Sequence, residues 1–401
     1  MNNATVRKLS KQDLLDLAEG AAILASGGGG PVNMIEPLID CILAAGDALL
    51  ADVSAVGDGD LVTCAYGAGS PSTVQAQPSE SAAKLSKACL EAHDAFAKDV
   101  GRAVNYTVAI ETGVINTLLP FYIAAKRGVP VLDGAGGRRS VPTITLTAFA
   151  LAEAPFSPMV MGNGADTPIT IDVATAAQAE APMMGIISTP AFSNSSGLSA
   201  WQIAGRDVAS SIEAGTVSYT MGLGAALRQS RDGGDPVSVV TEYLGGVVLL
   251  KGQLTSNSSQ TSNSWDFQQI LFKESGSDTE VRLYAQNETL IAWNNQHGEP
   301  VAMGPDLICY LAQDGTVFSN ADLDSIAGKD IAIIGAPATP LFRQEAVVHE
   351  FLTLLSALGY GGSYVPLQVA GAPAPSIPMP PHDARRHRLA ALKALRRHGR
   401  F

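Results

Sequence analysis

The spacing of apolar and polar residues predicts two structural halves in the chain. Apolar runs of strand length at residues 49–56, 61–66 and 106–110 alternate with stretches of helical period over roughly the first 160 residues. Strands that alternate with helices are typical of a layered α/β fold with a mostly parallel sheet. We therefore expect an α/β N-terminal domain over residues 1–165.

Two helices joined by a run of glycines are expected near the start of the chain. Ser10 and Asp13 have the spacing of a capping box, and the apolar positions after them have a helical period. The glycines at residues 27–30 end this helix, and Asn33 with Glu36 repeats the capping signal. The sequence thus predicts a helix, a glycine loop and a second helix.

Short apolar runs after residue 166 predict a second, β-rich domain. They lie at residues 237–243, 246–253, 280–285, 290–293, 301–303, 307–311 and 331–334. Short strands at this spacing are typical of a barrel-like or sandwich-like sheet. We therefore expect a β-rich C-terminal domain over residues 166–366, followed by a proline-rich linker and a basic helical tail over residues 367–401.

Three stretches of this second half have less regular patterns. Residues 183–188 are β-like, and residues 200–228 are expected to hold one or two helices broken near Gly215. Residues 255–263, with the sequence TSNSSQTSN, are expected to form a polar loop.

Composition and charge narrow the classes of function. Apolar residues make up 46% of the 401 residues, and the formal net charge is -12. The body of the chain before the basic tail is acidic and has no basic stripe, which argues against nucleic acid as the main ligand. No apolar run reaches the roughly 18 residues that span a bilayer, and the N-terminus lacks the apolar core of a signal peptide. With four separated cysteines and no CxxC pair, we expect a cytoplasmic protein that binds a small molecule and no membrane.

The stretch from residue 105 to residue 139 carries the strongest candidate site. A strand, a crossover helix and a parallel strand are predicted here, with Glu111 and Asp133 at the ends of the two strands. Ligands of open α/β sheets bind outside the carboxyl ends of the strands, so Glu111, Asp133 and Asn116 are candidate catalytic residues. Either carboxylate could act as a general base, and the amide could orient a ligand. Capping of a helix and a turn by the two acids is the alternative.

Two glycine loops and one arginine are candidates for contacts with the substrate. Backbone N–H groups of such loops can bind an anion or a carbonyl oxygen, and a tight turn without a ligand is the alternative. An arginine can bind a carboxylate in a bidentate contact, and an ion pair on the surface is the alternative. The candidate substrate-binding residues are Gly27, Gly28, Gly29, Gly30, Gly67, Gly69, Ser70 and Arg138.

Cysteine and histidine residues provide no metal signature of useful specificity. Cys64 has no paired histidine, so a buried structural thiol is expected there. His349 and Glu350 lack the second histidine of an HExxH motif. A zinc or other divalent ion held by scattered Asp, Glu and His side chains remains the alternative to a site without metal.

Several segments, in a fixed order, resemble the S-methyl-thiohydantoin desulfurase-like family. They are AAILASGGGG (21–30), YGAGSPSTV (66–74), AIETGVINTLLPFYIAAKRGVPVLDGAGGR (109–138), AQNETLIAW (285–293), GPDLICYL (304–311) and IAIIGAPATPLFR (331–343). The resemblance implies an α/β N-terminal domain, a β-rich C-terminal domain and chemistry on a five-membered hydantoin-like ring. Pro31, Ala135 and Thr143 stand where the family pattern leads us to expect acids, which leaves fewer ligands for a metal.

The resemblance and the candidate residues together suggest a hydrolase of a small cyclic amide or thioimidate, such as an S-methylated thiohydantoin. Water would attack the carbon between the two ring nitrogens, and methanethiol would leave, with Glu111 or Asp133 as the base. The alternative is a non-catalytic binding or regulatory subunit associated with hydantoin metabolism. A homo-oligomer is expected in either case.

Overall fold

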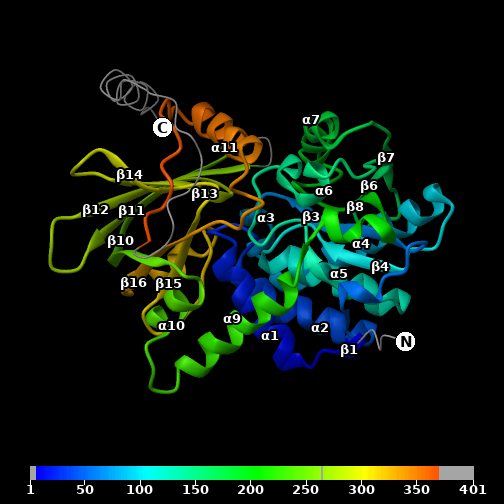
Figure 1. The fold of residues 1–401 in the computed structure, drawn as a ribbon, viewed down its shortest axis with the longest axis horizontal. Helices are drawn as coiled ribbons and strands as arrows, with labels where there is room; N and C mark the ends of the chain where they lie inside the picture. The colour runs from blue at the N-terminus through cyan, green and yellow to red at the C-terminus, as the bar shows by residue number, and fades with distance from the viewer. Residues whose placement is uncertain (1–5, 263–264, 370–401) are drawn as a thin grey trace.

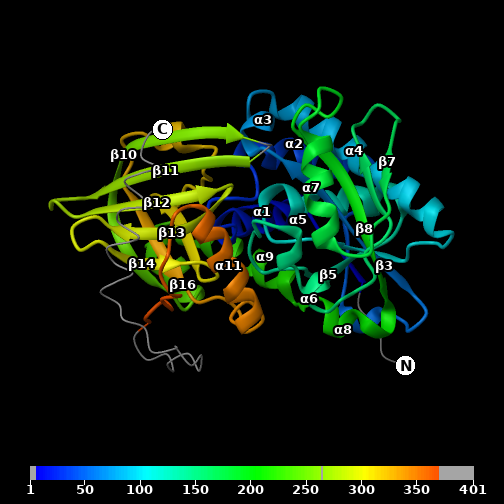
Figure 2. The same cartoon turned by 90° about the horizontal axis from the view of Figure 1, so that it is seen from above.

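The computed structural model describes residues 6–262 and 265–369, which form two sheets side by side with helices between and around them (Figures 1 and 2). The predicted tail, from residue 370 onward, lies outside the described residues. Within the described part of the chain, no helix is both long and apolar enough to cross a membrane.

The first sheet has nine strands in the described part of the chain, with parallel pairs at its centre. The pairs β2–β5, β5–β4 and β4–β3 are parallel, and the outer strands are antiparallel. The predicted α/β fold with a parallel arrangement is confirmed, with antiparallel strands added at both edges. The spatial order is β1 (Val6–Lys8), β2 (Leu49–Ala51), β5 (Val131–Ala135), β4 (Tyr106–Ala109), β3 (Leu61–Gly69), β8 (Ser195–Ala204), β6 (Met159–Gly162) and β7 (Ile169–Ile171), and β9 (Glu213–Ala214) pairs with β5.

Helices cover both faces of this first sheet (Figure 1). One hydrophobic core includes α1 (Lys11–Leu24), α2 (Ile35–Ala45), α4 (Pro78–Val100), α5 (Val114–Arg127) and α9 (Thr216–Ser230). A separate core on the opposite face includes α6 (Ala148–Leu151), α7 (Ala176–Ile187) and α8 (Val208–Ser211). The parallel strands are therefore buried on both sides, as such sheets require.

The second sheet consists of antiparallel strands and curls into a half-barrel. Leu307 and Cys309 of β15 pack into the same core as α1 and α9, so the two sheets share one continuous apolar contact. The predicted β-rich C-terminal half is confirmed. Its spatial order is β14 (Glu299–Met303), β13 (Glu288–Asn294), β12 (Glu280–Gln286), β11 (Trp265–Glu274), β10 (Val247–Ser262), β16 (Ile331–Ala336) and β15 (Leu307–Ala312), with α10 (Pro236–Tyr243) and α11 (Glu345–Ala357) against it.

Two local strand predictions are wrong because helix signals outweigh them. Residues 237–243 lie in α10, where the Asp235 side chain accepts a hydrogen bond from Ser238 N–H and Pro236 occupies the first turn. Residues 183–187 complete α7, whose start is capped by Thr175. In both places the capping residue starts a helix, and the β-branched or apolar residues after it continue that helix.

One further prediction, of a loop, is wrong because its residues pair in a sheet, and one helix prediction is confirmed with a later start. The helices expected within residues 200–228 and broken near Gly215 are α8 and α9, with Gly215 directly before α9, whereas residues 200–204 belong to β8. Residues 255–262, expected to form a polar loop, extend β10 and pair with β11 up to Ser262 opposite Trp265. The Ser10 capping box is present, whereas Asn33 caps no helix and instead donates a hydrogen bond to Gln75 O at 3.0 Å.

Glycines let α1 and α9 approach each other closely between the two sheets. A Cβ at Gly224 would lie 1.8 Å from Asp16 O, and a Cβ at Gly20 would lie 1.9 Å from Thr220 O. Arg228 spans the same contact, donating from Nε and Nη2 to the Asp16 carboxylate at 2.7 and 2.9 Å. Main-chain contact at two glycines thus sets the distance between these helices.

We predict that Gly224→Ala destabilises the protein by roughly 1–3 kcal/mol, because the added methyl meets a backbone carbonyl that cannot move alone. Gly185→Ala in α7 is the matched control, since nothing lies within 4 Å of its Cβ position. The control should stabilise by about 0.5–1 kcal/mol through helix propensity. Urea unfolding of both variants measures the difference, and equal stabilities would contradict the close helix contact.

Candidate functional site

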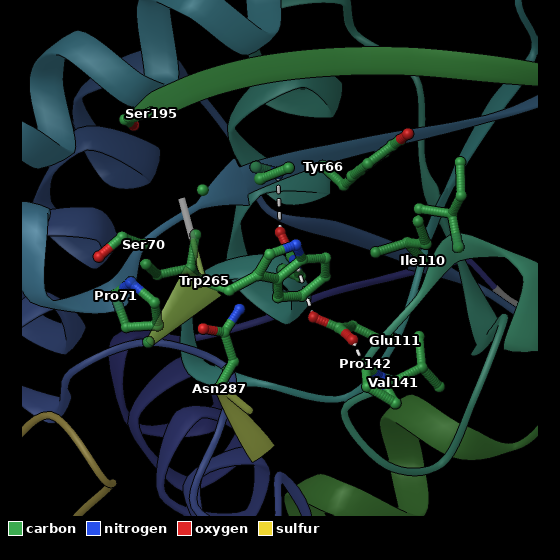
Figure 3. A pocket seen from close by; sticks show the side chains of 18 of the residues that line it. Tyr66, Ser70, Pro71, Ile110, Glu111, Val141, Pro142, Ser195, Trp265 and Asn287 are labelled. Atoms are coloured by element: carbon green, nitrogen blue, oxygen red, sulfur yellow. Dashed lines mark hydrogen bonds between the residues drawn. The ribbon is translucent and has the colours of Figure 1, made fainter. Parts of the chain in front are cut away.

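A cavity of about 110 Å³ lies where the ends of the parallel strands face the second sheet. Tyr66 and Glu111 line it from the first sheet, and Trp265 and Asn287 line it from the second (Figure 3). Because its wall comes from both halves of the chain, the cavity exists only when the two sheets are packed together.

Glu111 and Asn116 are in direct contact in this cavity. Glu111 follows β4 and is 7% exposed; its Oε1 accepts a hydrogen bond from Asn116 Nδ2 at 2.7 Å, and its Oε2 accepts one from Val141 N–H at 2.6 Å. Asn116 lies in the first turn of α5, and its Oδ1 accepts from Gly67 N–H at 2.8 Å. The chain Gly67, Asn116, Glu111 therefore fixes the orientation of the carboxylate.

Glu288, the first residue of β13, adds a second carboxyl group to the same cavity. Its side chain is 4% exposed, and Oε1 accepts a hydrogen bond from Ser140 Oγ at 2.7 Å. Its Oε2 is buried without a hydrogen-bond partner among the described residues. Ser140 also contributes a hydrogen bond that lowers the pKa of Glu111, so one hydroxyl lies between the two carboxyl groups.

Burial and mutual repulsion set the protonation of this pair. Burial raises the pKa of Glu111, and hydrogen bonds from Val141 and Asn116 oppose that shift. Burial, and then the charge of Glu111, raises the pKa of Glu288 to about 8. The two N–H hydrogen bonds to Glu111 favour its charged form, and a charged Glu111 in turn favours the protonated form of Glu288.

Arg139 supports the pair from behind the cavity. Its guanidinium is buried, donates from Nε to Ser140 O at 2.8 Å and from Nη1 to Pro305 O, and lies 4.9 Å from the Phe351 ring centroid. Its positive charge lowers the pKa of both Glu111 and Glu288. The Arg139 charge thus opposes the effect of burial on both carboxyl groups.

A third carboxyl group, Glu180 of α7, lines the same cavity. Its Oε2 accepts a hydrogen bond from Ile144 N–H at 3.2 Å, and its Oε1 is buried without a partner among the described residues. Burial raises the pKa of Glu180 to about 7, which the Ile144 hydrogen bond opposes. Three acids that titrate above their ordinary range therefore meet at one cavity, a pattern that is typical of functional sites.

The first glycine loop packs against the start of α5. Gly29 and Gly30 line the cavity and have φ values of 72° and 95°, which favour glycine. A Cβ at Gly29 would lie 2.5 Å from the Gly113 Cα, and Ile115 N–H donates to Gly29 O at 3.0 Å. Gly28 lies behind Glu288, because a Cβ there would be 2.2 Å from Glu288 Oε1.

The structure does not bring all predicted site residues together. Gly29, Gly30, Gly67, Gly69 and Ser70 line the cavity with Glu111 and Asn116. Gly27, whose Cβ position is filled by the Asn320 side chain, and Gly28 do not line it. The N–H of Gly67 is bonded to Asn116, so it serves the protein rather than a ligand.

Asp133 and Arg138 lie away from this cavity. The Asp133 carboxylate accepts hydrogen bonds from Ser218 N–H at 2.9 Å and Ser218 Oγ at 2.6 Å, in the first turn of α9. Arg138 lies 4.4 Å from the Tyr219 ring centroid and lines a second cavity of about 220 Å³. Neither side chain lines the cavity of Glu111.

The described residues contain no group of three or more His, Cys, Asp and Glu side chains arranged to hold a metal ion. Cys64 is fully buried in the strand core, and burial raises the pKa of its thiol well above the ordinary value. A buried thiol with a raised pKa has the character of the structural cysteine that the sequence suggests.

Two protein-family models match most of the chain. A model of the S-Me-THD-like N-terminal domain matches residues 12–173, and a model of the S-Me-THD-like C-terminal domain matches residues 176–367. The chain belongs to the S-Me-THD-like family. A crystal structure of a protein from Chromobacterium violaceum is similar, with a TM-score of 0.79 and 24% identity over 90% of this chain and 100% of that chain. That likeness shows a shared fold, and no curated protein matches the chain.

Sequence reasoning missed two carboxyl groups of this S-Me-THD-like site, Glu288 and Glu180. Each had a usable signal. Glu288 is the only charged residue in AQNETLIAW, a segment that carries the family resemblance, and Glu180 is the only charged residue between Asp172 and Arg206. An isolated acid in an apolar stretch is costly to bury, so its presence indicates a specific role.

We predict that Glu288→Gln makes the protein more stable relative to wild type as pH rises from about 5 to above 8. The pKa of Glu288 is about 8 in the folded protein, against an ordinary value of 4.5, so the unfolded chain loses this proton first. Between these two values the unfolded state binds fewer protons, and the stability of wild type falls as pH rises. The Glu288→Gln variant has no titratable group at this position, so its free energy of unfolding does not fall with pH in this way.

Urea unfolding at pH 5 and at about pH 8.5 measures the effect as a difference between variant and wild type. Asp58→Asn, which removes an exposed acid in a turn, is the control and should show no such pH-dependent difference. An equal effect of Glu288→Gln at both pH values would contradict the raised pKa.

Proposed function

We propose that this S-Me-THD-like protein hydrolyses a small hydantoin-like ring that carries an S-methyl thioimidate, and that it releases methanethiol. The observation that carries the proposal is the pair of buried carboxyl groups, Glu111 and Glu288, which come from the two halves of the chain and share one cavity. Hydrogen bonds favour the charged form of Glu111, and burial together with the charge of Glu111 raises the pKa of Glu288 to about 8, so the pair could supply a general base and a general acid. The family name points to the same class of ring.

In the first step, the Glu111 carboxylate takes a proton from water as the water oxygen bonds to the carbon between the two ring nitrogens. Glu288 gives its proton to the ring nitrogen whose double bond to that carbon is lost. The product of this step is a neutral tetrahedral intermediate. Backbone N–H groups of the Gly29 and Gly30 loop, which lines the cavity, would stabilise the partial negative charge on this oxygen as its proton leaves in the second step.

In the second step, the carbon–sulfur bond breaks and the carbonyl forms. The hydroxyl of the intermediate returns a proton to Glu288, and methanethiolate takes the proton held by Glu111. Both carboxyl groups end as they began, and the net reaction adds one water and releases methanethiol and the hydantoin. Asn116 keeps the Glu111 carboxylate in place throughout, through its 2.7 Å hydrogen bond.

We predict that Glu111→Gln lowers the rate of methanethiol release by about two or more orders of magnitude without unfolding the protein, because the amide cannot accept the proton of water. A free-thiol assay on a panel of S-methyl-thiohydantoins measures this rate. Asp133→Asn is the comparison variant and should retain turnover, because Asp133 contacts Ser218 outside the cavity. A larger loss in the Asp133 variant would transfer the role of base to Asp133.

The pH profile tests the role of Glu288 separately. In wild type, kcat/KM should fall above about pH 8, because Glu288 must be protonated to act as the acid. Glu288→Gln should lower the rate and remove that alkaline decline. If hydantoins raise the melting temperature but no substrate in the panel releases thiol, the protein is a binding or regulatory subunit instead.

A further inference from the structure

The second cavity, of about 220 Å³, differs in charge from the cavity of Glu111. Arg138 and Arg139 line it, and its described lining includes no aspartate or glutamate. The lining of the first cavity has the opposite character, with three glutamates and, among the described residues, no lysine, arginine or histidine. A ligand in the second cavity therefore meets two cationic side chains.

The guanidinium of Arg138 has few polar contacts at this cavity. It lies over the Tyr219 ring, 4.4 Å from the centroid, and its Nη2 donates a long hydrogen bond, at 3.4 Å, to Ala214 O. Its Nε is buried without a hydrogen-bond partner among the described residues. A buried donor without a partner is costly unless a ligand supplies the acceptor.

Arg139 brings a second unpaired donor to the same cavity. Its side chain is 2% exposed, and its Nε and Nη1 donate to the main-chain oxygens of Ser140 and Pro305. Its Nη2 is buried without a partner in the described part of the chain. Buried charges are ordinarily paired, yet no described carboxylate forms an ion pair with either of these arginines.

Two acids contact residues of this cavity, but their oxygens are already occupied. The Glu213 carboxylate accepts hydrogen bonds from Arg138 N–H at 2.7 Å and from the Thr339 hydroxyl. Asp306 forms an ion pair with Arg343 at 2.7 Å. Neither acid lines the cavity, so both guanidinium groups keep donors for a further anion.

The rest of the wall is largely apolar. Leu24, Leu244, Leu307 and Phe342 line the cavity opposite or beside the two arginines. Side chains of this kind favour the alkyl or ring part of a ligand, because its contact with water is then removed. A fully hydrated inorganic anion gains nothing from such a wall.

We propose that the second cavity binds a small carboxylate with an apolar body, with Arg138 and Arg139 at the carboxylate and the leucine and phenylalanine side chains around the apolar part. The planar guanidinium matches a carboxylate because it donates two parallel hydrogen bonds to the two oxygens. The proposal does not rest on the proposed hydrolysis, since Glu111 and Glu288 do not line this cavity.

Pentanoate and pentanamide test the proposal, because they have the same shape and differ in charge. Titration calorimetry of the full chain at about pH 7, where pentanoate is ionised, measures both affinities. Pentanoate should bind to wild type at least about tenfold more tightly than pentanamide, because its hydrogen bonds to arginine are charge-assisted.

Three variants show whether the arginine cavity is responsible. In Arg138→Gln, pentanoate should come within about threefold of pentanamide, since the charge is gone, while the backbone N–H bond to Glu213 is kept and the melting temperature checks the fold. Arg138→Lys keeps the charge and should keep a preference for pentanoate. Arg206→Gln removes an exposed arginine outside the cavity and should leave both affinities unchanged.

Absence of pentanoate binding to wild type, or equal binding of the two ligands, would overturn the proposal. A preference for pentanoate that persists unchanged in Arg138→Gln would place the anion elsewhere and overturn it as well. Inorganic phosphate that binds to wild type as tightly as pentanoate would overturn the assignment to a carboxylate with an apolar body. These measurements involve no methanethiol release, so they stand or fall separately from the proposed hydrolysis.

Discussion

The burial of two carboxyl groups side by side at the junction of the sheets is the constraint on which the site depends. Isolated buried charges are strongly unfavourable, so such a pair persists only with hydrogen bonds, a counter-charge or a retained proton. All three contribute here: Asn116 and Val141 bond to Glu111, Arg139 lies behind the pair, and burial raises the pKa of Glu288 to about 8. The segments that supply these groups converge from both halves of the chain.

The alternation of strands and helices was sufficient to predict the α/β half and the β-rich half, because apolar periodicity reports which faces are buried. The periodicity predicted the wrong element where other signals outweigh it. Residues 237–243 have the composition of a strand, but the Asp235 cap and Pro236 begin a helix there. Residues 255–262 are polar, yet β11 supplies hydrogen-bond partners for them, which no local pattern reveals.

The site was predictable only in part, for a similar reason. Glu111 and Asn116 are five residues apart on one strand–helix connection, so their contact follows from local geometry. Glu288 is far away in the sequence and reaches Glu111 only because the second sheet packs against the first. Asp133 also follows the rule for strand ends, but the N–H and hydroxyl of Ser218 in α9 occupy its carboxylate. An acid at a strand end can thus serve a helix as readily as a ligand.

The glycine contact between α1 and α9 involves none of the residues that line the cavity. Because main-chain atoms meet main-chain atoms at Gly20 and Gly224, the spacing of α1 and α9 does not depend on the size of neighbouring side chains. The side chains that α7 presents to the cavity lie in a different core, away from that contact. Residues on α7 can therefore be exchanged to reshape the cavity, while the contact between α1 and α9 is kept.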